Sequence, residues 1–326
     1  MTAPPRILFT RRWPGDAADR LRADGFSVDV QAEPRTLAEA ELAERARGAF
    51  ALVTTVEDAV TAAVLEAAGP ALRVVAQAGA GYDNVNLAAA RARGVWVTNA
   101  PGALTEATAD FAFALLLAVA RRLPEAERTV REGRWTGWHP DGLLGLELHG
   151  ATVGVVGLGK IGAAFARRCE GFGMDVLYWS RAPKPEAEAR GWRSSDLDDL
   201  LARADAVSLH VALTDETRGL LDRRRLGLMR PGAILVNTAR GGVVDQDALV
   251  EALQSGRLGG AGLDVTEPEP LPPHHPLLAC PGALVTPHIA SATAVTRSRL
   301  AAVAAENVRA VAEGRRPPNA VAGPDA

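Results

Sequence analysis

The stretch Thr152-Val-Gly-Val-Val-Gly157-Leu-Gly159-Lys160-Ile-Gly162 decides the fold of this chain. A run rich in β-branched residues ends at a glycine, and residues 163–169 continue with helical spacing. The sequence therefore predicts a strand, a tight turn and a helix, in that order. Glycines at this spacing permit the turn, let a pyrophosphate approach the backbone, and let the helix pack closely on the strand. With a further strand expected at 175–180, the stretch predicts a dinucleotide site at a helix N-terminus.

The composition indicates a globular protein with room for two domains. Of the 326 residues, 48% are hydrophobic and 23% are charged, and the formal net charge is −3. This charge, without a basic stripe, argues against a nucleic-acid partner. The most apolar run, residues 111–120, is too short to cross a bilayer, so no membrane partner is expected. Two cysteines and no visible signal peptide favour a cytoplasmic location.

Strands and helices alternate on both sides of the glycine-rich stretch, which predicts an α/β fold with parallel sheets covered by helices. The first unit lacks the phosphate-binding glycines, so we expect it to supply substrate contacts. The last helix, from Thr293 to about Glu313, then has to return to that unit. Residues 1–100 are thus expected to begin a substrate domain, 101–288 to form the dinucleotide-binding domain, and 289–326 to complete a discontinuous N-terminal domain.

Residues 123–149 interrupt the alternating pattern. They carry Trp135 and Trp138 on weakly patterned sequence. Tryptophans outside a periodic segment indicate a surface that packs on something else. We predict a dimerisation segment; the alternative is a loop folded on its own domain.

Three residues just past expected strand ends carry groups suited to the reduction of a ketone. Ligands of open α/β sheets lie beyond the carboxyl ends of the strands. Arg240 can form a bidentate pair with a substrate carboxylate or carbonyl. Glu269 can orient the ring of His288 and favour its protonated form, which can give its proton to the carbonyl oxygen as hydride reaches carbon. Taken singly, each could be an ordinary polar residue. No metal site is expected, because the other histidines lack suitably spaced carboxylates or thiols.

The end of the strand at 175–179 bears on the choice of cofactor. An NAD-binding fold carries an acidic residue about 20 residues past the glycines, and this chain reads Ser180-Arg181-Ala-Pro-Lys184 there. Ser180 can donate a hydrogen bond to a 2′-phosphate, Arg181 can pair with it, and Lys184 adds a screened attraction. We therefore predict NADP(H) in preference to NAD(H). The alternative is that Arg181 is only a solvated charge in the loop and that the enzyme uses NADPH and NADH equally well.

Four ordered motifs make the chain resemble the D-isomer-specific 2-hydroxyacid dehydrogenase family over essentially its whole length. They are Gly157-Leu-Gly-Lys-Ile-Gly162, Asn237-Thr-Ala-Arg240-Gly, Gly262-Leu-Asp-Val265 followed by Glu269-Pro270, and Pro287-His288-Ile-Ala-Ser-Ala-Thr293. Residues 78–84, 102–110 and 264–272 are most similar to members that reduce glyoxylate and hydroxypyruvate. The resemblance implies two Rossmann-like, doubly wound domains with a cleft between them, a homodimer joined through the nucleotide domain, and NAD(P)H-dependent reduction of small 2-oxo acids to D-2-hydroxy acids.

The resemblance also implies roles for individual residues. The catalytic residues fall on Arg240, Glu269 and His288. The amides of Ala80 and Gly81 are expected to bind the substrate carboxylate, the Ser291 hydroxyl to lie close to the substrate, and Trp138 to reach the partner subunit's substrate pocket. Cofactor contacts are expected from Thr105, Gly157, Leu158, Gly159, Lys160, Ile161, Gly162, Ser180, Arg181, Lys184, His210, Val211, Ala212, Thr238, Ala239, Arg240, Asp264, His288 and Ala290.

The chain differs from the family's common residues at three positions, and the family fold also serves other functions. Ala239, Ala212 and Ala290 stand where the family commonly has serine, proline and glycine, and none of these changes removes a catalytic group. A phosphoglycerate dehydrogenase often carries an extra C-terminal region, and a formate dehydrogenase would have glutamine in place of Glu269. A dinucleotide-sensing corepressor with this fold would usually carry long disordered extensions. We expect the reductase.

Overall fold

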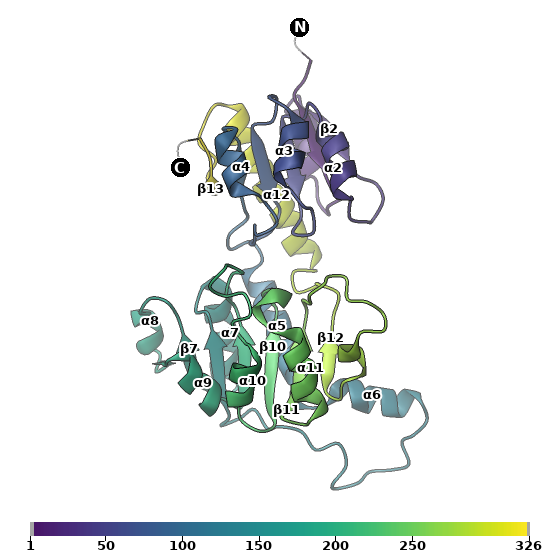
Figure 1. The fold of residues 1–326 in the computed structure, drawn as a ribbon, viewed down its shortest axis with the longest axis vertical. Helices are drawn as coiled ribbons and strands as arrows, with labels where there is room; N and C mark the ends of the chain where they lie inside the picture. Colours follow the sequence, from purple (N-terminus) through teal and green to yellow (C-terminus); the bar gives the residue numbers. More distant parts are fainter. Residues whose placement is uncertain (1–2, 325–326) are drawn as a thin grey trace. The chain divides into compact units, whose positions relative to one another are not determined.

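The computed structural model describes residues 3–324. It divides into two compact units (Figure 1). Unit 1 contains the chain up to Leu104 and again from Ala292, and unit 2 contains Thr105–Ser291. Each unit is an α/β structure built on its own sheet, which confirms the predicted fold class. The assignment of substrate binding to unit 1 and dinucleotide binding to unit 2 stays a prediction at this point.

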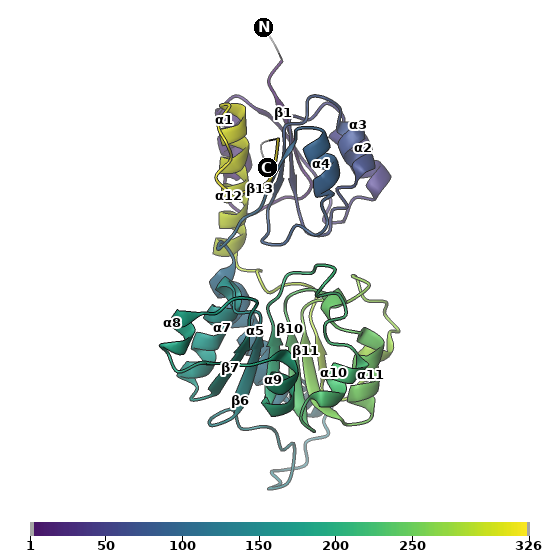
Figure 2. The same ribbon diagram turned by 60° about the vertical axis from the view of Figure 1, so that its left-hand side comes forward.

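Within the described residues, unit 1 has a six-stranded sheet of order β13-β5-β4-β3-β1-β2. All pairs are parallel except β13 with β5, which is antiparallel. Helices α1 and α12 cover one face, and α2, α3 and α4 cover the other (Figure 2). The elements are β1 (Arg6–Phe9), α1 (Ala17–Ala23), β2 (Ser27–Val30), α2 (Glu39–Ala46), β3 (Ala51–Thr54), α3 (Ala62–Ala68), β4 (Val74–Gln77), α4 (Leu87–Ala92), β5 (Trp96–Thr98), α12 (Ala294–Ala312) and β13 (Ala320–Ala322).

Unit 2 has a seven-stranded, wholly parallel sheet of order β12-β11-β10-β9-β6-β7-β8. Helices α5 and α7 pack together on one face, and α9, α10 and α11 pack on the other. The elements are α5 (Thr105–Ala120), α6 (Leu123–Arg131), β6 (Thr152–Val156), α7 (Lys160–Gly171), β7 (Asp175–Trp179), α8 (Pro185–Glu188), β8 (Arg193–Ser194), α9 (Leu197–Arg203), β9 (Ala206–Leu209), α10 (Arg223–Leu228), β10 (Ala233–Asn237), η1 (Gly241–Val243), α11 (Gln246–Gln254), β11 (Leu258–Leu263), η2 (Pro276–Ala279) and β12 (Ala283–Val285).

The strand composition follows from burial on both faces. All residues of β3, β4, β9 and β10 are buried, and they form the near-continuous apolar runs that parallel sheets require. Strand β11 is glycine-rich for a different reason. A Cβ on Gly260 or Gly262 would lie 2.5 Å from Val119 or 2.9 Å from Leu115 of α5. The glycines therefore let α5 lie directly on the sheet.

The order of the strands creates a switch point in unit 2. From β6 the chain moves to β7 and β8 on one side, and then crosses to β9, β10, β11 and β12 on the other. Right-handed crossovers then place the helices of the two halves on opposite faces. A crevice at such a point, beyond the carboxyl ends of β6 and β9, is where dinucleotides bind in doubly wound sheets.

Candidate active site

The registers of three neighbouring strands bring the predicted catalytic residues to one edge of the unit 2 sheet. Asn237, the last residue of β10, pairs with Leu263 of β11, and Leu263 pairs with Val285 of β12. The three strands therefore end level with one another. The segments that carry Arg240, Glu269 and His288 all start from this edge.

Glu269 and His288 form a direct pair. His288 Nδ1 lies 2.7 Å from Glu269 Oε1, and the side chains keep 24% and 29% of their exposure. Among residues 3–324, the other ring nitrogen, Nε2, has no hydrogen-bond partner. The carboxylate thus fixes the orientation of the ring, while Nε2 stays available to a ligand.

A buried carboxylate holds the segment that carries His288. Asp264, only 1% exposed, accepts hydrogen bonds at Oδ1 from Thr286 Oγ1 (2.6 Å) and Ile289 N (2.8 Å). Its Oδ2 accepts a bond from Ala290 N at 2.7 Å. His288 itself has a φ of +52°, a conformation that non-glycine residues rarely adopt. Because Asp264 holds the chain on both sides of His288, it can maintain this strained backbone. Sequence reasoning expected only a cofactor contact from Asp264.

The backbone around Arg240 is similarly constrained. Asn237 Nδ2 donates to Arg240 O at 2.8 Å, and Ala239 N donates to Asn237 Oδ1 at 2.9 Å. A Cβ on Gly241 would lie 2.1 Å from the carbonyl of Thr266. Only glycine at this position therefore lets the loop after β10 contact the loop after β11 through the backbone. The loop of Arg240 therefore packs against the start of the loop that carries Glu269.

The glycine loop between β6 and α7 fits a pyrophosphate. Gly157 has a φ of +97°, and a Cβ on it would lie 2.8 Å from His210 O. A Cβ on Gly162 would lie 2.1 Å from Gly157 O, whereas one on Gly159 would meet nothing within 4 Å. The twelve-residue helix α7 begins at Lys160 without a side-chain cap. The open space at Gly159 and the uncapped amides form the cradle that a diphosphate needs.

Two further polar groups lie at the same edge. Thr238 Oγ1 is buried without a hydrogen-bond partner among residues 3–324, which suits a site that a bound cofactor completes. His210 follows β9, its ring centroid lies 5.0 Å from that of Phe165, and its Nε2 lies 2.9 Å from Ser208 Oγ. Burial of the ring lowers the pKa of His210 to about 3. The ring is therefore neutral near pH 7.

The low pKa of His210 makes the protein less stable in acid. The unfolded chain takes up this proton below about pH 6.5, whereas the folded chain takes it up only near pH 3. Stability should therefore fall as the pH drops through this window, by up to about 1.4 kcal/mol per pH unit from this group. In urea unfolding at pH 7 and pH 5, His210→Gln should lose less stability between the two pH values than the parent protein. Equal losses would contradict this role.

The residues predicted to bind the 2′-phosphate of the cofactor follow β7. Ser180 is partly buried and Arg181 is exposed. The pKa of the Glu216 carboxyl is lowered, first by the hydroxyl of Thr214 and to a smaller degree by the charge of Arg181. The charges of Arg181 and Glu216 therefore interact, although Arg181 makes the smallest of these contributions.

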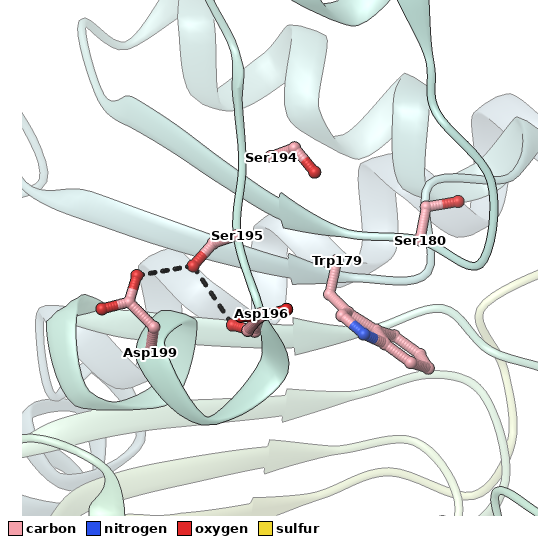
Figure 3. Close-up of a pocket in the computed structure, with 6 residues that line it drawn as sticks. All are labelled: Trp179, Ser180, Ser194, Ser195, Asp196 and Asp199. Atoms are coloured by element: carbon pink, nitrogen blue, oxygen red, sulfur yellow. Dashed lines mark hydrogen bonds between the residues drawn. The ribbon is translucent and has the colours of Figure 1, made fainter.

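Beside Ser180 lies a pocket of about 480 Å³ (Figure 3). Ser195 Oγ donates to Asp199 Oδ2 at 2.7 Å, and Arg203 pairs with the same carboxylate at 2.8 Å. These contacts lower the pKa of Asp199 and keep it ionised. The sequence has no carboxylate at the end of β7, but Asp196 and Asp199 at the start of α9 form an acidic wall beside Ser180, which the sequence did not predict. The lining residues are Trp179, Ser180, Ser194, Ser195, Asp196 and Asp199.

The remaining predicted site residues have the following places. Ala80 and Gly81 follow β4 in unit 1, where both are partly buried, and Trp138 in unit 2 is 84% exposed. Thr105 opens α5 and Ser291 closes unit 2. Leu158, Lys160 and Ile161 belong to the glycine loop and α7, Val211 and Ala212 follow β9, Ala239 precedes Arg240, Ala290 is buried beside Asp264, and Lys184 precedes α8.

Residues 3–324 bring together no group of three His, Cys, Asp or Glu side chains able to hold a metal ion. No helix within the same residues combines the length and the apolar character that a membrane crossing requires.

Comparison with known proteins agrees with this geometry. Residues 113–290 match the model of the D-isomer specific 2-hydroxyacid dehydrogenase NAD binding domain. A glyoxylate reductase of Korarchaeum cryptofilum is 47% identical over 97% of this chain and 96% of its own. A crystal structure of a Thermus thermophilus protein has a TM-score of 0.91 at 55% identity, covering 97% of this chain and 99% of its own. The NADPH-dependent glyoxylate/hydroxypyruvate reductase of Sinorhizobium meliloti, solved with NADP and malonate, has a TM-score of 0.85 at 35% identity, covering 98% and 97%. The chain belongs to the D-isomer specific 2-hydroxyacid dehydrogenase family.

Proposed function

We propose that this protein reduces small 2-oxo acids, glyoxylate and hydroxypyruvate first, to the corresponding hydroxy acids, glycolate and D-glycerate. The observation that carries the proposal is the 2.7 Å pair of His288 and Glu269 at the sheet edge that also carries Arg240. The relatives named glyoxylate reductase, at 45–47% identity over 97% of the chain, support the same substrates.

Each residue has a separate task in this reaction. The glycine loop and the start of α7 would hold NAD(P)H, which when bound would be the source of the hydride for the carbonyl carbon. His288 gives its proton from Nε2 to the carbonyl oxygen, so that the carbonyl group becomes a neutral alcohol group. Glu269 keeps the ring oriented, and Arg240 holds the substrate by charge-assisted hydrogen bonds. We also propose that the amides of Ala80 and Gly81 bind the substrate carboxylate and that the Ser291 hydroxyl lies beside the substrate.

The configuration of the product tests this proposal. Hydroxypyruvate should yield D-glycerate, which can be measured by chiral chromatography after complete conversion with NADPH. Racemic glycerate or L-glycerate would contradict the proposed substrate orientation, and a lack of turnover would contradict the function.

We propose NADP(H) as the preferred cofactor, with NAD(H) as the alternative. The glycine loop supports a dinucleotide, and Ser180 and Arg181 support a 2′-phosphate. The similarity to the Sinorhizobium enzyme, which is described as NADPH-dependent, supports the same preference. Glu216 and the acidic wall formed by Asp196 and Asp199 oppose it. The preference should therefore be moderate and should depend on Arg181. The other cofactor contacts predicted from the sequence, from Thr105 to Ala290, belong to this proposal.

We further propose that the protein is a cytoplasmic homodimer joined through residues 123–149. This segment contains the helix α6, which has no buried residue and which the sequence did not predict. Its large apolar side chains are unusually exposed for a monomer, and a second copy of the chain would cover them. They include Leu123 at 53%, Val130 at 59%, Trp135 at 65%, Trp138 at 84% and Leu144 at 67%. Cys169 and Cys280 are both free and buried, as suits a reducing compartment.

Trp138 should restrict the substrate in the partner's site. We expect Trp138→Ala to raise kcat/KM for bulkier 2-oxo acids relative to glyoxylate, because a large side chain has been removed from the pocket wall. Trp135→Ala is the matched control, because Trp135 is exposed in the same segment but bonds to Gly137 O. Sedimentation of the parent protein as a fully active monomer would rule out a contribution from the partner.

A further inference from the structure

The edge of the unit 1 sheet contains an arrangement that the proposed function does not yet use. Strands β4 and β5 are parallel neighbours, and Ala76 pairs with Thr98. The chain leaves β4 through Gly79 and Ala80, and it leaves β5 through Asn99 and Ala100. The two exits therefore run side by side at the carboxyl edge of the sheet.

The exit from β5 holds two successive carbonyl groups of the exit from β4. Ala100 N donates to Gly79 O at 2.8 Å. The side chain of Asn99 donates from Nδ2 to Ala80 O at 2.7 Å. One contact is made by the backbone and persists with any residue except proline at position 100. The other depends entirely on the amide of Asn99.

These contacts fix the direction of the two amides that follow. In a planar trans peptide, the C=O and the N–H of the same unit point in opposite directions. With Gly79 O and Ala80 O turned toward β5, the N–H groups of Ala80 and Gly81 must point away from it. Neither N–H has an acceptor among residues 3–324. Successive free N–H groups of this kind form an anion-binding concavity.

We propose that Asn99 is a positioning residue for carboxylate recognition, because it turns the Gly81 amide toward the substrate. This inference rests on the proposed function, which makes the amides of Ala80 and Gly81 the ligands of the substrate carboxylate. Asn99 is partly buried, and its Nδ2 donates to Ala80 O. It acts through the peptide unit between Ala80 and Gly81.

A role in folding alone makes a different prediction from a role in positioning. If Asn99 only closes the loop, its loss lowers stability without a selective effect on carboxylate binding. If Asn99 positions the Gly81 amide, its loss weakens the binding of every ligand that binds through a carboxylate. Cofactor binding and proton donation by His288 then stay unchanged. A change in KM without a change in kcat therefore distinguishes a positioning role from a role in folding alone.

The test compares Asn99→Leu, which keeps the size of the side chain but removes the donor, with Thr10→Val. Thr10 is fully buried in the same unit and donates to Asp58 Oδ2 at 2.5 Å, so its replacement also removes an internal hydrogen bond. For Asn99→Leu, the KM for glyoxylate and the inhibition constant of oxalate should rise by a common factor of about tenfold. The kcat and the Kd for NADPH should stay near the parent values. Thr10→Val should lower Tm and leave both carboxylate constants unchanged.

Three results would overturn the inference: unchanged constants in Asn99→Leu, an equal rise in Thr10→Val, or a loss confined to kcat. If Asn99→Leu does not fold, Asn99→Ala removes the same donor and takes its place. If the parent protein reduces no 2-oxo acid, the proposed function is contradicted, and the inference about Asn99 is then tested by binding. Calorimetric titration of the full chain with oxalate would still compare the parent with the Asn99 variant.

Discussion

Replacing His288 by alanine is expected to lower kcat for 2-oxo acid reduction by about 10²- to 10⁴-fold, the usual contribution of a positioned general acid. The reason is that only the ring of His288 combines an orienting carboxylate at 2.7 Å with a ring nitrogen left without a partner among the described residues. Cofactor binding should be nearly unchanged, because the glycine loop is built by β6 and α7. Steady-state rates and a fluorescence titration with NADPH measure the two quantities.

His149→Ala is the matched control for this experiment. His149 is exposed and precedes β6, so it lies at the opposite edge of the sheet from the carboxyl ends of the strands. Its loss should leave kcat close to that of the parent protein. Near-parental turnover in the His288 variant would refute the assignment of the proton donor.

Replacing Arg181 by alanine is expected to raise the KM for NADPH by about tenfold to a hundredfold and to leave the KM for NADH nearly unchanged. A hydrogen bond to a charged group is worth ~1.5–3 kcal/mol, and only NADPH has the 2′-phosphate that Arg181 can bind. Adding Ser180→Asp should reverse the preference, because a carboxylate repels the phosphate and accepts hydrogen bonds from ribose hydroxyls.

Arg190→Ala controls for a general loss of positive charge. Arg190 pairs with Glu170 at 3.1 Å and lies over the ring of Trp192, both in unit 2. Its removal should affect NADPH and NADH alike. If the parent protein uses NADH as efficiently as NADPH, the interpretation of Ser180 and Arg181 is wrong, and Glu216 and the acidic wall beside Ser180 become the explanation.

The features that could be predicted from sequence depend on local pattern. The β-branched run of β6 and the glycines after it predict strand, turn and helix, and the structure has β6 at Thr152–Val156 and α7 at Lys160–Gly171. Helices α1 (Ala17–Ala23) and α3 (Ala62–Ala68) belong to the alternation of strands and helices that the sequence predicts before the glycine-rich stretch. Parallel strands that are buried on both faces can be predicted, because both faces require apolar residues.

The features that sequence reasoning missed depend on partners distant in the chain. Strand β13 forms only because Ala320 and Ala322 meet β5, about 220 residues earlier, and the two-residue β8 exists only beside β7. Helix α6 buries none of its own residues, so no apolar stripe facing its own unit identifies it.

Within the site, the catalytic residues could be predicted from the sequence, but the hydrogen bonds that hold their segments in place could not. Arg240, Glu269 and His288 could be named from their places after strands. The three hydrogen bonds by which Asp264 holds the His288 segment require the registers of β10, β11 and β12. The contact of Asn99 with Ala80 O likewise requires β4 and β5 to be neighbours.

The reduction of small 2-oxo acids is the activity that we propose for this protein. Initial rates with glyoxylate, hydroxypyruvate, pyruvate and 3-phosphohydroxypyruvate, each with NADPH and with NADH, test it most directly. We predict the highest kcat/KM for glyoxylate or hydroxypyruvate with NADPH. A highest kcat/KM for 3-phosphohydroxypyruvate, or no turnover of any of the four acids, would contradict it.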